Sequence, residues 1–393
     1  MTAFLNQLGL VCSLGRGQRA VREALFRADA PQGMTVSEAF SPGRCLHLGE
    51  VTAELPGSSA WPLWHRSRNN TLLAAALQEI RPAVDAAIAR LGPSRVAIVV
   101  GGSTSGVREG EAAKFARRES GRWPSDYDYR QQELGSSSSF LAWLLGTSGP
   151  AHVISTACSS GAKALASAAR LLQAGLADAV IAGGADSLCR FTVAGFTALA
   201  SVSATRCNPL SRNRSGINLG EGAALFLMTR EAGAVRLAGW GETSDAHHIS
   251  SPDPTGRGAI DAISQALRRA ALAASAVDYV NLHGTATLQN DVMESRAIER
   301  TIGTQVPVSS TKPLTGHALG AAGAIEAAFA WLTLVENPFG LLPPHWWDGQ
   351  ADPELPGLHL VKPGERLGRP LRHVLSNSFA FGGSNASLLL SPG

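Results

Sequence analysis

The chain alternates short β-branched and apolar runs with longer runs in which apolar residues recur at helical spacing. The short runs predict strands over residues 95–100, 151–156, 179–182, 223–228, 279–283, 306–309, 373–375 and 386–390. The longer runs predict helices over residues 71–91, 161–174, 258–273, 292–302 and 320–335. Residues 1–15 predict a first strand, and the polar residues 109–139 a long excursion. Alternating strands and helices predict an α/β fold.

Two of the predicted helices, 161–174 and 320–335, are rich in alanine and carry few charges, which is typical of helices buried on all sides. Cys158 precedes the first of them, and His317 precedes the second. This weak internal repeat predicts two halves of the same topology, joined near residues 230–237. Cys158 and His317 would then occupy matching positions and meet at a pseudo-twofold axis.

Composition narrows the class of protein mainly by exclusion. Hydrophobic residues make up 45% of the 393 and charged residues 17%, as in a globular protein. The net charge of +3 is too small to predict nucleic-acid binding. The best candidate for a membrane span, residues 318–335, carries Glu326, so no span is expected. The five cysteines are widely spaced without a CxxC pair, which predicts reduced thiols in a cytoplasmic protein rather than disulfides or a zinc site.

Cys158 ends the β-branched run 153–156, and small residues and a predicted helix follow it. That order places a thiol at a strand-to-helix turn, near the first free N–H groups of the helix. These groups and the helix dipole favour a thiolate. The sequence therefore predicts that Cys158 is a nucleophile rather than a core residue.

Three other polar segments also follow predicted strands. They are residues 283–291, which begin with His283, residues 310–320, which contain Lys312 and His317, and residues 377–385. Functional groups of α/β proteins gather at such strand ends. We therefore expect the three segments to share a site with Cys158.

Together with the T-A-C-S-S-G stretch at 156–161, these segments resemble the β-ketoacyl-acyl carrier protein synthases, condensing enzymes of the thiolase superfamily. The resemblance covers nearly the whole chain. It implies a thiolase-like fold with two pseudo-repeated halves, residues 1–234 carrying the nucleophile and residues 235–393 carrying the histidines, in a layered αβαβα arrangement. It also implies a Cys-His-His enzyme.

In the family such an enzyme extends a fatty acid, polyene or polyketide chain by two carbons. Cys158 would hold the acyl chain as a thioester, while His283 and His317 would face the malonyl extender and promote its decarboxylation. Lys312 would be buried beside the histidines and paired with a carboxylate, for which Glu294 fits.

The same resemblance assigns the remaining site residues. The backbone N–H groups of Cys158 and Phe381 would form an oxyanion hole. Thr285 and Thr287 would contact the pantetheine arm of the substrate, and Phe381 with Phe379 would form the gate between the acyl tunnel and the extender site.

The implied partners are an acyl carrier protein bearing acyl and malonyl groups, and a second subunit. That subunit is either another copy of this chain or a chain-length-factor-like homologue. No metal or organic cofactor is implied. The stretch 208–221 and the D-A-H-H pattern at 245–248 resemble the synthases of bacterial aryl polyene and related type II polyketide clusters.

Other readings fit the residues less well. Thiolases need a second cysteine near the C-terminus, and none follows Cys207. Starter-type synthases pair their cysteine with one histidine and one asparagine, whereas this chain offers two histidines. The alternative that stays open is a non-catalytic, chain-length-factor-like partner subunit, although such subunits lack the nucleophile.

Overall fold

One twisted sheet runs through the computed structural model, which describes residues 2–393. Its first five strands are β1 (Ala3–Cys12), β5 (Val96–Gly101), β6 (Ala151–Ile154), β7 (Ala179–Asp186) and β8 (Gly222–Thr229). The other five are β9 (Val235–Ser244), β10 (Tyr279–Asn281), β11 (Val308–Ser309), β12 (Val374–Ala380) and β13 (Ser384–Pro392). The short β2 (Gly15–Arg16) pairs with β1 at the edge of this path, and β3 (Thr35–Ser37) pairs with β4 (Leu46–Leu48) in a separate hairpin.

The two sets of strands repeat one topology. The first set lies in the order β1-β8-β7-β5-β6 and the second in the order β9-β13-β12-β10-β11, so strands of the same rank in each half occupy the same place. In both halves the last three strands of this order are mutually parallel, and the first two are antiparallel to each other. The halves join where residues 3–5 of β1 pair with residues 235–237 of β9. This arrangement confirms the predicted α/β class and the internal repeat.

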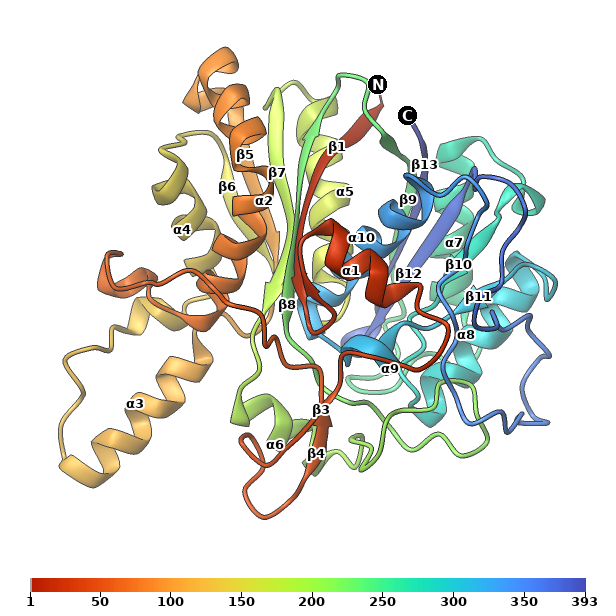
Figure 1. The fold of residues 1–393 in the computed structure, drawn as a ribbon, viewed down its shortest axis with the longest axis horizontal. Helices are drawn as coiled ribbons and strands as arrows, with labels where there is room; N and C mark the ends of the chain where they lie inside the picture. The colour runs from red at the N-terminus through yellow and green to blue at the C-terminus, as the bar shows by residue number, and fades with distance from the viewer. Residues whose placement is uncertain (1) are drawn as a thin grey trace.

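Two helices lie between the halves and others cover the outside (Figure 1). The inner helices are α5 (Ser160–Gln173), which follows β6, and α10 (Ala322–Leu334), which follows β11. On the outer faces lie α2 (Arg68–Leu91) and α4 (Ser136–Leu145) against the first set of strands, and α7 (Arg257–Ala270) and α8 (Leu288–Thr301) against the second. The result is a five-layered αβαβα stack, in which the two sets of strands form the two β layers.

The alanine and glycine content of α5 and α10 follows from how closely they approach. A Cβ atom on Gly161 would lie 2.7 Å from the backbone nitrogen of Ala324, and one on Gly323 would lie 2.8 Å from that of Ala162. Real Cβ atoms do not tolerate such distances, so only glycine fits at these crossings. The close contact fixes the start of each helix, and with it the residues that precede each helix.

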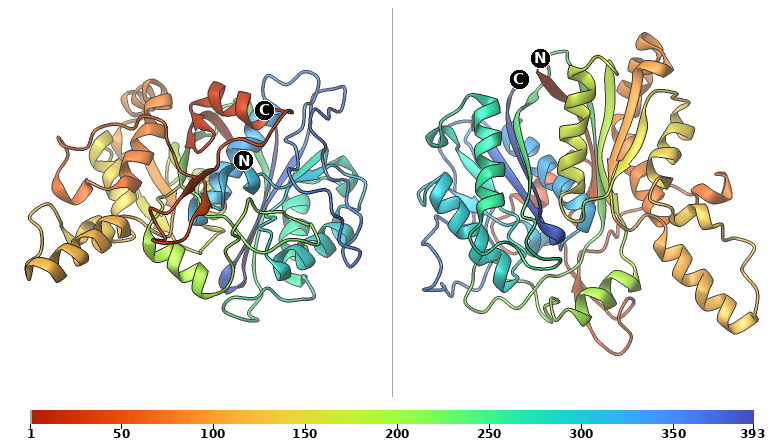
Figure 2. Two further views of the ribbon diagram at one scale, coloured as in Figure 1. Left: turned by 60° about the horizontal axis from the view of Figure 1, so that its bottom comes forward. Right: turned by 180° about the vertical axis from the view of Figure 1, so that it is seen from behind.

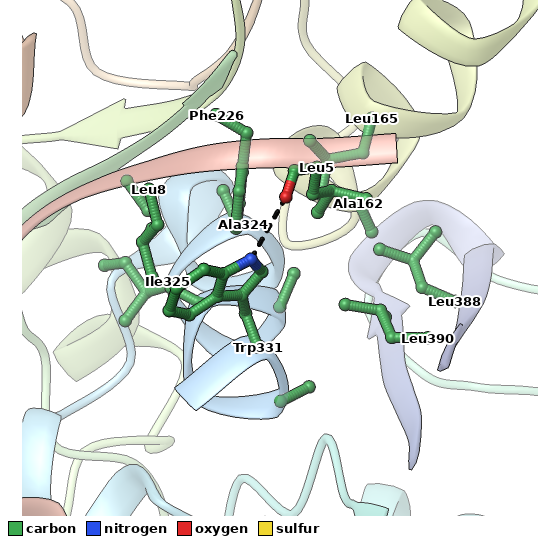
Figure 3. Close-up of a cluster of buried hydrophobic side chains, with 14 of the residues drawn as sticks. Leu5, Leu8, Ala162, Leu165, Phe226, Ala324, Ile325, Trp331, Leu388 and Leu390 are labelled. Atoms are coloured by element: carbon green, nitrogen blue, oxygen red, sulfur yellow. Dashed lines mark hydrogen bonds between the residues drawn. The ribbon is translucent and has the colours of Figure 1, made fainter. Parts of the chain in front are cut away.

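The core around α10 is shown in Figure 3. Trp331 packs among Leu8, Phe226 and Ile325, and its indole Nε1 donates a hydrogen bond of 3.1 Å to the carbonyl oxygen of Leu5. Burying a large aromatic side chain stabilises a core most when its polar atom keeps a partner. This contact ties the central helix to the first strand.

The excursion predicted over residues 109–139 is more regular than expected. It contains α3 (Val107–Ser120), the 3₁₀ turn η3 (Tyr129–Gln132) and the start of α4, and α3 projects away from the body of the molecule (Figure 2). The shorter helices α1 (Gln18–Leu25), α6 (Arg190–Ala198) and α9 (Lys312–Thr315) were not predicted either. Within residues 2–393, none of the helices has both the length and the apolar character needed to cross a membrane.

Candidate active site

Cys158 sits in a tight turn between β6 and α5, where the sequence predicts it. Ala157, just before it, has a left-handed backbone with φ of 52°. Ser160 secures the turn, because its Oγ donates 2.6 Å to the carbonyl of Ala157 and accepts 2.9 Å from the N–H of Thr156. The cysteine side chain is thereby fixed at the head of α5, and the residue is only 6% exposed.

His317 and His283 converge on this sulfur from the other half of the chain. Nε2 of His317 lies 2.9 Å from Sγ of Cys158. The rings of His283 and His317 stand edge to face at 82°, with centroids 5.3 Å apart. One ligand atom from each of the three side chains lies within 4.8 Å of the other two, and all three residues are buried. Segments far apart in sequence therefore form one cluster.

The backbone before His317 determines where its ring lies. Gly316 has a φ of 64°, and a Cβ atom there would lie 2.5 Å from the carbonyl oxygen of Leu219. The N–H of His317 donates 2.6 Å to the carbonyl of Asn218. The imidazole is thus positioned by contacts with the strand-like segment before β8.

Glu294 positions the loop of His283. Its carboxylate accepts hydrogen bonds from the backbone N–H groups of His283 at 2.8 Å and Gly284 at 2.7 Å. Burial raises the pKa of Glu294 to about 7. This carboxylate acts on the backbone that carries the histidine, and it makes no hydrogen bond with Lys312.

The predicted partner of Lys312 is therefore wrong. Lys312 is 1% exposed, and its Nζ lies 2.5 Å from Oε1 of Glu326 on α10. The same ammonium donates to the backbone carbonyl of His283. Glu294 is already occupied by backbone donors, whereas Glu326 would otherwise be a lone carboxylate inside an apolar helix. A buried charge needs such a partner.

Ionisation in the cluster follows from burial. The pKa of His283 and that of His317 are held well below the usual value, first by burial and then by the charge of Lys312. Both imidazoles are therefore neutral near pH 7. Burial likewise raises the pKa of the Cys158 thiol to about 11, against the opposing effects of Lys312 and two backbone N–H groups. The expectation of a resting thiolate is corrected: the thiol is protonated, with His317 in place to receive its proton.

The two N–H groups near the sulfur belong to Cys158 and Phe381, the pair predicted from the sequence. Phe381 also packs against Phe196, with ring centroids 5.7 Å apart, and the ring of Phe379 lies 6.3 Å from that of His283. Both phenylalanines thus border the cluster.

A cavity of about 390 Å³ leads to the cluster. Cys158, both histidines, Phe379 and Phe381 line it, and so do Thr285 and Thr287. The two threonine hydroxyls lie 3.1 Å apart. The structure therefore brings every predicted site residue except Lys312 and Glu294 to one cavity, and it places those two directly behind it.

Asp186 was missed by the sequence analysis. It is fully buried, and its carboxylate accepts from the backbone and hydroxyl of both Ser103 and Thr104. It also accepts 2.6 Å from the N–H of Gly320, three residues after His317. Asp186 thus joins the end of β7 to the histidine loop, a role that an acidic residue at the end of an apolar strand could have suggested.

His345 is a second residue that the sequence did not single out. Its Nδ1 accepts 3.1 Å from the N–H of Ser310, so its Nε2 carries the proton that it donates to the carbonyl of Pro209 at 3.0 Å. Burial lowers the pKa of His345 to about 4, so it remains neutral. It fixes the segment that leads to Lys312. Nothing in its own sequence context distinguishes it from a surface histidine.

Comparison with known proteins agrees with this geometry. The model of the β-ketoacyl synthase N-terminal domain matches residues 72–234, and that of the C-terminal domain matches residues 234–345. The chain belongs to the β-ketoacyl synthase family, and the predicted family and thiolase-like fold are confirmed.

Among curated relatives, 3-oxoacyl-[acyl-carrier-protein] synthase 2 of Rhizobium meliloti is 38% identical over 62% of this chain and 61% of its own length. The chain thus spans about three fifths of that relative. The mitochondrial 3-oxoacyl-[acyl-carrier-protein] synthase of Arabidopsis thaliana is 31% identical over 98% of this chain and 92% of its own.

Among solved structures, the ketosynthase ApeO in complex with its chain length factor ApeC from Xenorhabdus doucetiae superposes with a TM-score of 0.93. The two chains are 44% identical, and the match covers 100% of this chain and 98% of the ketosynthase chain. A β-ketoacyl synthase from Burkholderia phymatum has a TM-score of 0.87 at 27% identity, over 100% and 99% of the two chains.

Proposed function

We propose that this protein condenses an acyl chain held on Cys158 with a malonyl group held on an acyl carrier protein, releasing carbon dioxide and lengthening the chain by two carbons. One observation carries the proposal: the thiol of Cys158 lies 2.9 Å from Nε2 of His317. The ring of His283 completes the same buried cluster. The reaction then has two steps, each with its own requirement.

In the first step the acyl group moves from its carrier to Cys158. His317 is neutral and takes the thiol proton as the sulfur attacks the thioester carbonyl, then returns it to the departing carrier thiol. The oxyanion of the tetrahedral intermediate is stabilised by the backbone N–H groups of Cys158 and Phe381, which lie at the sulfur. Because the pKa of the thiol is about 11, this step depends on a base in contact with the sulfur.

In the second step the malonyl thioester loses carbon dioxide, and its electron pair forms an enolate. His283 and His317, in their neutral N–H forms, donate to the enolate oxygen, and each such donor typically contributes about 3 kcal/mol in comparable sites. The carbanion attacks the acyl carbonyl on Cys158, the new carbon–carbon bond forms, and the carbon–sulfur bond breaks. The cysteine leaves as a thiolate, and a proton from solvent, relayed through His317, restores the thiol. Lys312 and Glu294 hold the histidine loop, while Thr285 and Thr287 bind the pantetheine arm.

The non-catalytic alternative is disfavoured by the same cluster. A subunit that only shapes a partner's tunnel needs neither a nucleophile nor a neutral histidine in contact with it. Here Cys158, His283 and His317 are all present, buried and within 4.8 Å of one another. Apolar residues would fill the same space at least as well, so packing alone does not explain these three side chains.

For the pathway and the partner, we propose an aryl polyene or related type II system. The support is the 44% identity over the full chain to a ketosynthase described in complex with its chain length factor. In this proposal the second subunit is a chain-length-factor-like homologue, and the substrates come from an acyl carrier protein. The free state of all five cysteines fits a cytoplasmic setting.

Intact-mass spectrometry tests the proposal. Protein incubated with an acyl-loaded carrier should gain one acyl group on Cys158, and later malonyl carrier should release that group as an elongated product. Cys158→Ser should show neither mass change nor elongation. The matched control is Cys189→Ser, another buried cysteine, whose Sγ lies 3.3 Å from the hydroxyl of Thr192. The opposite result would be that the protein gains no acyl group but increases the condensation rate of an active homologue. That result would support the alternative of a non-catalytic partner subunit.

A further inference from the structure

The catalytic cluster also has the composition of a metal site. A cysteine sulfur and two imidazoles are the donors that Zn²⁺ prefers, and three protein ligands with one open position are typical of its non-structural sites. Here the three ligand atoms lie within 4.8 Å of one another, on three buried residues. The cavity of about 390 Å³ supplies the open fourth position.

The geometry needs only small adjustments to hold an ion. Bonds of about 2.3 Å to sulfur and about 2.0 Å to nitrogen put tetrahedral ligand atoms roughly 3.3–3.6 Å apart. The observed 2.9 Å between Sγ of Cys158 and Nε2 of His317 would open slightly, and the longer separations would close.

Two features limit how tightly an ion would bind. Nδ1 of His283 and Nδ1 of His317 are buried without a hydrogen-bond partner among residues 2–393. Zinc-binding histidines are ordinarily held by such a partner, and its loss costs about 10–100-fold in affinity. The ammonium of Lys312, in contact with the His283 carbonyl, also repels a cation. These features favour reversible occupancy over a permanent structural ion.

We propose that Cys158, His283 and His317 form a reversible, inhibitory Zn²⁺ site in the unacylated protein, with water from the cavity as fourth ligand. Binding replaces the thiol proton by a sulfur–zinc bond and releases one proton to solvent, with no change of oxidation state. An acylated Cys158 has no thiolate to offer, so acylation and zinc binding exclude each other. The inhibitory consequence, though not the binding, rests on the proposed condensation.

Binding is tested with Co²⁺ as a spectroscopic probe, in a Cys45→Ser background that removes the exposed thiol beside Glu38. We expect one Co²⁺ per chain, a near-ultraviolet sulfur-to-cobalt charge-transfer band, and displacement by Zn²⁺. The band should vanish in Cys158→Ser, and the affinity should fall at least tenfold in His317→Ala. Cys189→Ser is the control and should bind as the parent does.

A second measurement does not depend on the folding of a variant. Alkylation of Cys158 in the parent protein with iodoacetamide should abolish the band, and Zn²⁺ should in turn slow that alkylation at least tenfold until a chelator is added. Unchanged Co²⁺ binding after alkylation, or in Cys158→Ser, would overturn the proposal, as would the absence of any charge-transfer band.

Condensation assays separate the two proposals. Metal-free protein that condenses but neither binds Co²⁺ nor loses activity with Zn²⁺ would refute the metal site alone. Protein that binds Co²⁺ through Cys158 yet fails to condense would refute the proposed function and leave the metal site in place.

Discussion

The buried pair of Lys312 and Glu326 makes a prediction that depends on which carboxylate is the partner. Lys312→Met should leave Glu326 uncompensated, and Glu326→Gln should leave the ammonium uncompensated. The two side chains are only 2% and 4% exposed, so solvent cannot replace the missing charge. Removing one partner of such a pair costs about 3–5 kcal/mol of unfolding free energy.

Removing both charges together should restore much of this loss, because no unpaired charge then remains. We expect a coupling energy of about 2–3 kcal/mol between the two substitutions, at the upper end of values for contacting residues. The penalty of Lys312→Met alone should increase as pH rises. Burial already raises the pKa of Glu326. When the folded-state pKa of a carboxyl is raised, the free energy of unfolding falls as rising pH ionises that carboxyl.

Urea unfolding followed by far-ultraviolet circular dichroism measures all four corners of this cycle. The matched control is a second cycle that combines Lys312→Met with Glu294→Gln. Glu294 accepts hydrogen bonds from the backbone of His283 and Gly284 and none from Lys312. Its coupling with Lys312→Met should be about 1 kcal/mol or less. A strong coupling to Glu294 and a weak one to Glu326 would refute the reasoning.

Three further predictions concern the site. The rate of Cys158 alkylation by a small neutral reagent should rise about tenfold per pH unit from pH 7 to pH 10, because the pKa of the thiol is about 11; a plateau below pH 8 would contradict this. Cys158→Gln, whose amide mimics the acylated thiol, should decarboxylate malonyl carrier without forming product, and carbon dioxide release no faster than in Cys158→Ala would contradict it. Gly316→Ala should lower the free energy of unfolding by about 2 kcal/mol or more and displace His317, since the new Cβ would lie 2.5 Å from the carbonyl oxygen of Leu219. The control is Gly357→Ala, which has open space around it and should unfold as the parent protein does.

The strands and helices that carry the chemistry could be predicted because each is locally encoded. The β-branched run before Cys158 and the small-residue helix after it appear as β6 and α5 with nearly the predicted bounds. β9 was not predicted, since Gly239, Trp240 and Gly241 interrupt its period. That strand exists because β1 and β13 pair with it on either side, which is information outside the segment.

The repeat predicted that Cys158 and His317 meet, and the place of His283 after a strand, with the family resemblance, added it to the cluster. The hydrogen bonds and ion pairs behind the cluster were not predicted. Glu294 and Glu326 lie at similar distances from Lys312 in sequence, 18 and 14 residues away, and only the packing of α10 decides between them. The protonated state of Cys158 depends on burial, which outweighs the helix N-terminus in this cavity. The boundary between residues 234 and 235 and the roles of Thr285, Thr287 and Phe379 stay predictions.

His283→Ala tests the division of labour most directly, because His283 lies in the cluster but makes no hydrogen bond to the sulfur among residues 2–393. The measurement is paired: intact mass for the acyl group on Cys158, and carbon dioxide release from malonyl carrier. We predict acylation at a rate close to that of the parent, with decarboxylation reduced at least a hundredfold. Loss of acylation with carbon dioxide release intact would contradict the assignment of His283 to decarboxylation and of the base for acylation to His317.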